Sequence, residues 1–166
     1  EGPDSTFYGH EMAGARITRK ILTNLQFRLK LCHTISLLVK YHMFYYNVGE
    51  VTERSVRRLV AKVGLENMED LMKLRICDRM GSGVPKPEPY RLRHFKYMVE
   101  KVQHDPISPK MLKVNGNDIM KELGMGPGPK VGQILQILLD EVLDDPKNNT
   151  KSYLMKRVKG LGSMKD

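Results

Sequence analysis

Residues 114–135 read VNGNDIMKELGMGPGPKVGQIL and decide the fold of this chain. They predict a short helix, a turn of glycines and prolines, and a long helix. Pro129 stands where the long helix begins, and proline suits the first helical position because its missing N–H would be unpaired there anyway. Gly128 and Gly132 keep bulky side chains away from this helix end. Backbone N–H groups point outward from it and the helix dipole adds partial positive charge, so the sequence predicts a place where an anion can sit.

The apolar positions of the long helix repeat at helical spacing, so one of its faces is expected to lie in the core. These positions are Val131, Ile134, Leu135, Leu138, Leu139 and Val142. The same period predicts helices over residues 11–25, 29–45, 53–63, 68–81, 90–104 and 150–158. No alternating apolar and polar run of strand length occurs. The sequence therefore predicts an all-α fold, a helical bundle of about seven helices in two parts.

Two segments stand out among these. Residues 29–45 are the most continuously apolar and are expected to form a central helix, whereas the tail from Gly160 is expected to fray. Residues 82–89 read SGVPKPEP, and prolines at this density cannot continue a helix. We therefore expect one domain over residues 1–81, a Pro-rich linker and basic helix over 82–113, and a C-terminal body over 114–166.

Composition narrows the possible functions. The chain has 166 residues with 28 Lys+Arg against 19 Asp+Glu, and its formal net charge of +9 makes a nucleic-acid phosphate the first anion to consider. Cys32 and Cys77 lie in apolar helical patterns and are expected to be reduced and buried. The lack of a C-x-x-C motif argues against structural zinc, and no apolar run is long enough to span a membrane. The first residues resemble a loop without a starting Met, so we expect a piece of a longer protein.

These motifs carry a family resemblance. The run 114–120, the Pro-Gly-Pro turn and Gly132-x-x-Leu135-x-x-Leu138 resemble the C-terminal body of bacterial tRNA nucleotidyltransferases, the CCA-adding enzymes related to poly(A) polymerase. In the N-terminal half, residues 7–15, 39–43 and 77–81 are similar to the second part of the HD-type helical domain that many of those enzymes carry. The resemblance covers nearly the whole chain and implies a partial HD-type domain followed by an RNA-binding body.

The resemblance also shows what the chain lacks. The family's nucleotide-adding head carries a Gly-Gly-x-x-Arg-Asp region and an Asp-x-Asp pair that holds metal, and neither occurs here. It implies that the parent enzyme adds CMP and AMP to tRNA 3′ ends in the cytoplasm, using CTP, ATP and magnesium. This chain would hold no cofactor. It would bind tRNA, with the missing N-terminal catalytic head as its partner.

Basic residues near the turn are the candidate RNA contacts. The family resemblance favours contact with tRNA phosphate and sugar, which suits an enzyme that must accept every tRNA, because duplex RNA displays its backbone and hides its bases. The predicted contacts are Arg91, Arg93, Lys96, Lys110, Lys113, Gly126, Gly128 and Lys130. The plainer interpretations are that the turn is only a tight connector between two helices, and that the basic side chains form a solvated face.

A metal site is the competing hypothesis. In HD-type phosphohydrolases, His and Asp residues on facing helices hold a divalent metal that activates water. His10, His42 and Asp78 match later positions of that pattern, but the defining His-Asp pair is missing. We expect these three to make polar contacts between helices and to bind no metal. The alternative function is a remnant of an HD-type metal-dependent phosphohydrolase acting on nucleotides.

Overall fold

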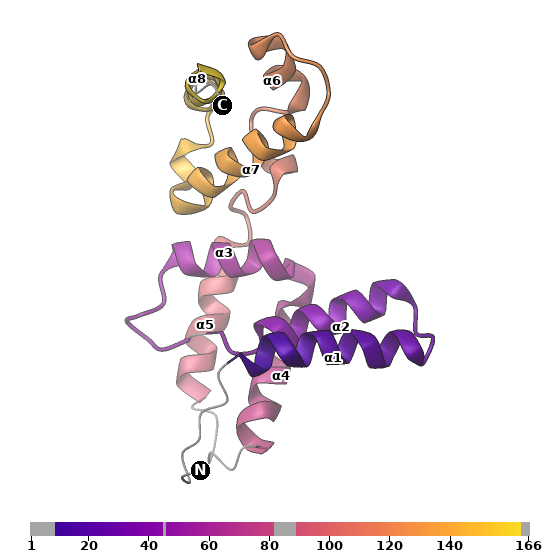
Figure 1. Cartoon of the computed structure of the whole chain (residues 1–166). Coiled ribbons are helices and arrows are strands. Elements are labelled where there is room, and N and C mark those ends of the chain that lie inside the picture. Colours follow the sequence, from indigo (N-terminus) through magenta and orange to yellow (C-terminus); the bar gives the residue numbers. More distant parts are fainter. Residues whose placement is uncertain (1–8, 45, 82–88, 164–166) are drawn as a thin grey trace. The chain divides into compact units, whose positions relative to one another are not determined.

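The computed structural model describes residues 9–44, 46–81 and 89–163 (Figure 1). All regular elements among these residues are helices, so the predicted all-α fold is confirmed, with eight α-helices where about seven were expected. Their bounds are α1 His10–Asn24, α2 Leu29–Tyr41, α3 Glu53–Val63, α4 Met68–Gly81, α5 Pro89–Val102, α6 Gly116–Leu123, α7 Pro129–Asp144 and α8 Lys151–Ser163. No helix in the described part of the chain has the length and apolarity needed to span a bilayer.

The chain forms two compact units, with the division falling inside α3 and α5. Unit 1 comprises Glu1–Val51 and Lys62–Tyr97, and unit 2 comprises Thr52–Ala61 and Met98–Asp166. The three domain segments expected from the sequence stay a prediction.

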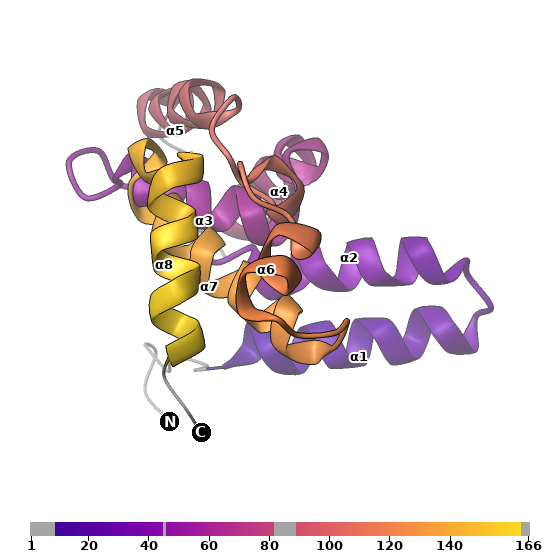
Figure 2. The same ribbon diagram turned by 90° about the horizontal axis from the view of Figure 1, so that it is seen from above.

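In unit 1, α1 and α2 form an antiparallel helical hairpin, and they lie side by side in both views (Figures 1 and 2). Gly14 permits their close approach, because a Cβ there would stand 3.3 Å from Cγ1 of Val39. The core of the unit lies elsewhere, around Phe44 and Phe95, whose ring centroids are 4.7 Å apart. The hairpin therefore owes its order chiefly to the contact between its own two helices and to the packing of α2 on α4.

Two expectations about burial in unit 1 are wrong. The helix expected to be central ends at Tyr41 and buries only Cys32, while Leu29 and Leu31 are exposed. Cys77 is exposed, although its apolar surroundings in the sequence suggested burial. It follows Met72, which is buried, by five residues, and at about 100° per residue this turns it roughly 140° around α4, away from the core face.

In unit 2 the core follows the predicted face of α7. Val131, Ile134, Leu138, Leu139 and Val142 are all buried, and Leu135 is partly buried against the same cluster. Ile119 of α6 and Leu154 and Val158 of α8 complete it, and none of these three has any exposed surface. Figure 2 shows the three helices from above. The helical spacing of apolar residues in α7 therefore predicted the core of this unit correctly.

The C-terminal tail is better ordered than expected. Instead of fraying from Gly160, α8 continues to Ser163. The reason is a helix contact: Gly162 packs so closely on Leu123 of α6 that an added Cβ would overlap the leucine side chain. Near Gly160 a Cβ would meet nothing within 4 Å.

These two glycines make a matched test of the packing of α8. We expect Gly160→Ala to raise the free energy of unfolding by about 0.5–1 kcal/mol, because alanine favours the helix over glycine. Gly162→Ala should gain the same propensity but lose more by overpacking against Leu123, for a net loss of about 1 kcal/mol. Thermal unfolding of both variants measures the difference. Equal melting temperatures would show that α8 does not pack on Leu123.

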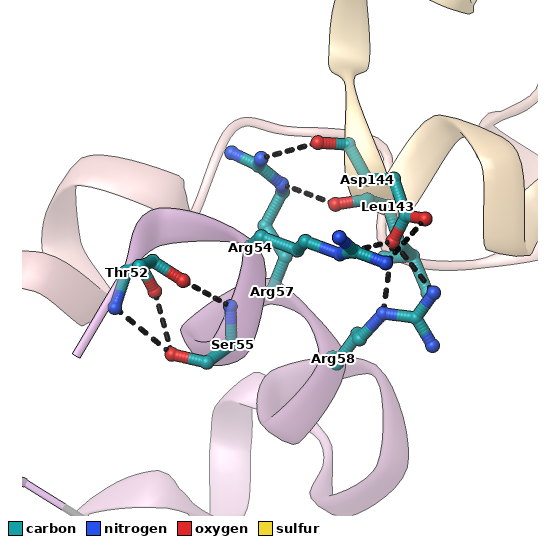
Figure 3. A network of polar contacts seen from close by, with 7 residues as sticks. All are labelled: Thr52, Arg54, Ser55, Arg57, Arg58, Leu143 and Asp144. Atoms are coloured by element: carbon teal, nitrogen blue, oxygen red, sulfur yellow. Dashed lines mark hydrogen bonds and ion pairs between the residues drawn. The ribbon is translucent and has the colours of Figure 1, made fainter. Parts of the chain in front are cut away.

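A network of arginines from α3 closes the C-terminal end of α7 (Figure 3). Arg57 is buried; its Nε donates to the carbonyl oxygen of Leu143 at 2.8 Å and its Nη2 to that of Asp144 at 3.2 Å. Arg54 and Arg58 both donate to the Asp144 carboxylate, at 2.7 and 2.6 Å for their shortest bonds. Burial opposes ionisation of Asp144, but hydrogen bonds and charge from Arg58 and Arg54 outweigh it and lower the pKa of the carboxyl. The last carbonyls of a helix lack partners within it, and here α3 supplies them.

Helix α8 is tied to α7 by a second carboxylate. Glu141 accepts hydrogen bonds from Arg157, the shortest at 2.6 Å, and from the Tyr153 hydroxyl at 3.2 Å. The Arg157 bonds hold the pKa of Glu141 below its ordinary value of 4.5, although partial burial acts in the other direction.

This lowered pKa predicts an acid-sensitive contribution to the stability of unit 2. A carboxyl with a depressed folded-state pKa stabilises the fold above its unfolded pKa, and the contribution is lost as pH falls through the folded value. We expect Glu141→Gln to cost about 1 kcal/mol at pH 7, since Arg157 is partly exposed, and less at pH 3, because the contribution falls as the pH drops below 4.5. Urea unfolding at both pH values measures this, with Glu100→Gln as a control. A penalty that persists undiminished at pH 3 would contradict it.

Candidate nucleic-acid interface

The start of α7 has the form that the sequence predicted. Pro129 is the first helical residue, no side chain caps the end, and residues 126–130 are all exposed. Gly128 has φ 177°, an extended conformation open to any residue, and a Cβ at Gly126, Gly128 or Gly132 would meet nothing within 4 Å. Neither backbone strain nor packing therefore requires glycine at these three positions, and the helix end is open to an approaching backbone or anion.

The start of α6 is closed by the protein itself. Asn115 Oδ1 accepts from the N–H groups of Asn117 and Asp118, and Asp118 Oδ2 accepts from the N–H of Asn115 at 2.9 Å. This reciprocal pair is a capping box, and the bond from the Asn115 amide lowers the pKa of Asp118. A Cβ on Gly116 would stand 3.3 Å from Val131, so the beginnings of α6 and α7 pack closely together. Of the two helix starts, only that of α7 lacks a side-chain cap.

The segment before α6 is pinned by one amide side chain. Asn149 accepts from the N–H of Lys113 at 2.9 Å and donates to the carbonyl oxygen of Met111 at 3.0 Å. Leu112 and Val114 point into the core of unit 2. Lys110 and Lys113 are exposed, as is Lys130 at the start of α7. Five of the predicted contact residues lie in unit 2: Lys110, Lys113, Gly126, Gly128 and Lys130. The segment that carries Lys110 and Lys113 is held by the Asn149 hydrogen bonds and by core packing.

The other three predicted contacts, Arg91, Arg93 and Lys96, belong to unit 1. Arg91 donates to the Asn47 side chain at 2.9 Å and is partly buried. Arg93 and Lys96 are exposed and line a groove of about 410 Å³ between α4 and α5, where Lys73 and Glu69 also lie. Glu69 is bonded to Lys73, which lowers its pKa, so part of the positive charge in this groove is neutralised within the protein.

The weak metal candidates come together in unit 1. His42 is buried, its Nδ1 lies 2.6 Å from the carbonyl oxygen of Val39, and its Nε2 lies 3.8 Å from Asp78. The rings of His10 and His42 pack edge to face, with centroids 5.4 Å apart. Asp78 also pairs with Arg75 at 3.2 Å, and a guanidinium beside a carboxylate competes with a cation for its oxygens. The contacts are polar and link three helices; the expectation that no metal binds stays a prediction.

Comparison with known proteins identifies the family. The profile for tRNA nucleotidyltransferase domain 2 matches residues 16–158. The chain belongs to the tRNA nucleotidyltransferase family. This confirms the resemblance found in the sequence motifs.

Two curated members of this family show how similar their sequences are to this chain. The A-adding tRNA nucleotidyltransferase of Deinococcus radiodurans is 32% identical over 141 residues, which cover 81% of this chain and 31% of that protein. The CC-adding tRNA nucleotidyltransferase of Thermus thermophilus is 30% identical over 134 residues, covering 81% of this chain and 29% of that protein. The chain therefore spans about a third of the length of these curated relatives. No solved structure matches it.

Sequence reasoning missed the arginines of α3 in this family member. Arg54, Arg57 and Arg58 lie in the run R-S-V-R-R, which suggests a basic surface, yet these side chains contact the end of α7 and Asp105. The available signal was the acidic end of the long helix, where the Asp144 carboxylate beside the last carbonyls favours nearby cations. These arginines count toward the net charge but are committed to holding unit 2 together.

Proposed function

We propose that this chain is the tRNA-binding, C-terminal portion of an enzyme that adds CMP or AMP to tRNA 3′ ends. Nucleotide addition, with magnesium, CTP and ATP, would belong to a catalytic head outside this sequence, and the protein would act in the cytoplasm. Family membership supports the proposal. So do the names of the two relatives, each of which aligns with this chain over about a third of its own length.

The observation that carries the binding role is the uncapped start of α7 beside exposed lysines. Its outward N–H groups and dipole favour an anion, and Lys130 stands at the first turn. Lys113 precedes α6, whose first turn packs on Val131 of α7. Phosphate contacts of this kind fix a protein on RNA without reading bases. The basic residues Arg91, Arg93 and Lys96 of unit 1 would add further backbone contacts.

The proposal predicts salt-dependent binding of tRNA that is independent of sequence. Replacing Lys113 and Lys130 by glutamine should weaken every tRNA alike. Each phosphate that is no longer neutralised should flatten the slope of log affinity against log salt by somewhat under about one unit. Gly128→Val should also weaken binding by blocking close backbone approach. Because Gly128 is extended and its surroundings are open, this variant should keep its melting temperature.

Fluorescence anisotropy with labelled tRNA at several salt concentrations measures both effects. The matched control replaces Lys147 and Lys156, which are exposed in the same unit, and removes the same charge. If the control weakens tRNA binding as much as the Lys113 and Lys130 variant, the start of α7 is not where tRNA binds. If the wild-type chain binds no tRNA at low salt, the proposed function is wrong.

The HD-type phosphohydrolase remnant ranks second, supported by the proximity of His10, His42 and Asp78. The ion pair of Asp78 with Arg75 argues against it. Stoichiometric manganese, iron or nickel that survives dialysis and disappears in Asp78→Ala would reverse this order.

A further inference from the structure

A second basic groove runs along one side of the α1–α2 hairpin. It has a volume of about 280 Å³, and Arg16 and Arg19 of α1 line it opposite His33, Ser36 and Lys40 of α2. We propose that this groove binds backbone phosphates of tRNA and is a contact surface separate from the start of α7. This inference rests on the proposed function and extends it to residues of unit 1 that were not among the predicted RNA contacts.

The charge of the groove is not balanced by the protein. No carboxylate lines it, and among the residues that the structure describes neither Arg16 nor Arg19 makes an ion pair. The Nζ of Lys40 lies 5.3 Å from the centroid of the Tyr41 ring, a contact that leaves its charge uncompensated. The sole acidic residue of the hairpin, Glu11, lies outside the lining and faces His10 at 3.8 Å. An anion entering the groove would therefore meet three cations and no competing carboxylate.

Several other cations among the described residues are neutralised by carboxylates of the protein. Arg54 and Arg58 share Asp144, Arg75 bonds to Asp78, and Arg157 bonds to Glu141. On α8, Lys151 faces Asp118 and Lys159 faces Glu122. Against this background, three like charges gathered on facing helices without a carboxylate repel one another, and a bound anion relieves that repulsion.

Helix geometry places the cations of each helix on the side that faces the groove. Arg16 and Arg19 are one turn apart, about 4.5 Å along the axis, so they project from the same side of α1. Ser36 and Lys40 are four residues apart on α2 and also share a side. Because Gly14 allows the two helices to approach closely, both rows border one narrow groove with Met12 and Leu37 in its lining.

The form of the groove favours a polymer over a small anion. Arg16, Arg19 and His33 are exposed, so the site is open and a single phosphate would remain largely hydrated. A nucleic-acid backbone presents successive phosphates, and its binding gains from the counterions released at each contact. The family's tRNA substrates, named for both relatives, supply such a backbone.

The test uses the full chain and three double variants that each remove two charges. Arg16→Gln with Arg19→Gln empties the groove of its α1 cations. Lys20→Gln with Lys30→Gln removes two exposed charges from the same hairpin outside the groove and is the matched control. Lys113→Gln with Lys130→Gln alters only unit 2. Since all six side chains are exposed, circular dichroism should show unchanged folding and melting.

We expect the groove variant to bind tRNA about tenfold more weakly near 100 mM salt and to reduce the salt slope by more than about one unit, with the control close to wild type. If the groove variant matches the control while the Lys113 and Lys130 variant is weakened, the groove inference is wrong and the proposed function stands. If the wild-type chain binds no tRNA, the proposed function itself fails.

A separate titration with ATP and with inorganic phosphate, followed by the NMR signals of α1 and α2, distinguishes a free phosphate ligand from RNA. Saturable shifts with either compound, combined with unchanged tRNA binding in the groove variant, would overturn the RNA assignment. Weak shifts that do not saturate, with the tRNA effect present, would support it.

Discussion

Replacing Arg57 by methionine is expected to lower the free energy of unfolding of unit 2 by about 3 kcal/mol, the low end for removing one partner of a buried ion pair, because Arg57 is buried while Asp105 is partly exposed. Arg57 is 5% exposed and bonds to three acceptors at once. It donates to two carbonyl oxygens at the end of α7 and to the Asp105 carboxylate at 3.1 Å. Methionine fills similar space, so the destabilisation reports the polar interactions and not a cavity.

The physical reason is that no other group can take over these hydrogen bonds. The carbonyls of Leu143 and Asp144 are among the last four of α7, which have no partner inside the helix. Without Arg57 the carbonyl of Leu143 would be left unpaired in a buried position and that of Asp144 in a partly buried one, and the Asp105 carboxylate would lose its ion pair with the guanidinium. Arg57→Lys should recover only part of the stability, because one ammonium cannot reproduce the planar fork that reaches all three acceptors.

Arg54→Met is the matched control on the same helix. Arg54 is 58% exposed and shares Asp144 with Arg58, so its removal leaves that carboxylate paired and should cost less than about 1 kcal/mol. Urea unfolding followed by circular dichroism gives the two free energies, and hydrogen exchange of the α7 amides assigns the change to unit 2. Equal costs for Arg54 and Arg57 would show that the buried network does not hold α7.

The parts of the fold that follow from local pattern could be predicted from the sequence. The apolar period of α7 identified the side chains that form the core of unit 2, and Pro129 marked the first residue of that helix. Both signals act within a few residues of one another, where helix geometry is fixed by the backbone itself. The start of α3 shows a contact of the same local kind: the Thr52 hydroxyl accepts from the N–H of Ser55 at 3.2 Å, and the Ser55 hydroxyl accepts from the N–H of Thr52 at 3.1 Å.

What could not be predicted depends on contacts between distant segments. Arg57 bonds to Leu143, which lies 86 residues later in the sequence, and no pattern near Arg57 predicts that partner. The same holds for Gly162, whose close packing on Leu123 joins two separate helices. An apolar pattern also does not reveal which face finds a partner. It therefore misassigned α2, where only Cys32 is buried, and Cys77, which lies on the exposed side of α4.

The candidate site was predicted as one basic track, and the structure divides its residues between two units. Lys110, Lys113 and Lys130 share unit 2 with the start of α7, whereas Arg93 and Lys96 lie beside α4 in unit 1. Charge along the sequence gives the number of cations and not which of them are neutralised. That distinction separates Arg58, which is bound to Asp144, from Arg16, whose groove contains no carboxylate.

This chain alone is expected to add no nucleotide to tRNA. Phosphoryl transfer by two metals needs carboxylates free to hold the ions about 3.5–4 Å apart. Three of the four carboxylates at the acidic end of α7 are already engaged: Glu141 by Arg157, Asp144 by Arg54 and Arg58, and Asp145 by the N–H of Lys147. Within the described residues no group of three or more metal-binding side chains converges.

Incubation with labelled CTP, ATP, magnesium and tRNA tests this expectation, with a full-length A-adding or CC-adding relative as the positive control. The relatives are about three times as long as the segment they share with this chain, so the chemistry is expected to lie in the remainder. Clear incorporation by the chain alone would overturn the assignment of chemistry to a separate head. If incorporation were also abolished by Asp144→Asn, the carboxylates at the end of α7 would have to leave their arginines to bind metal, and the network of Figure 3 would be catalytic and not structural.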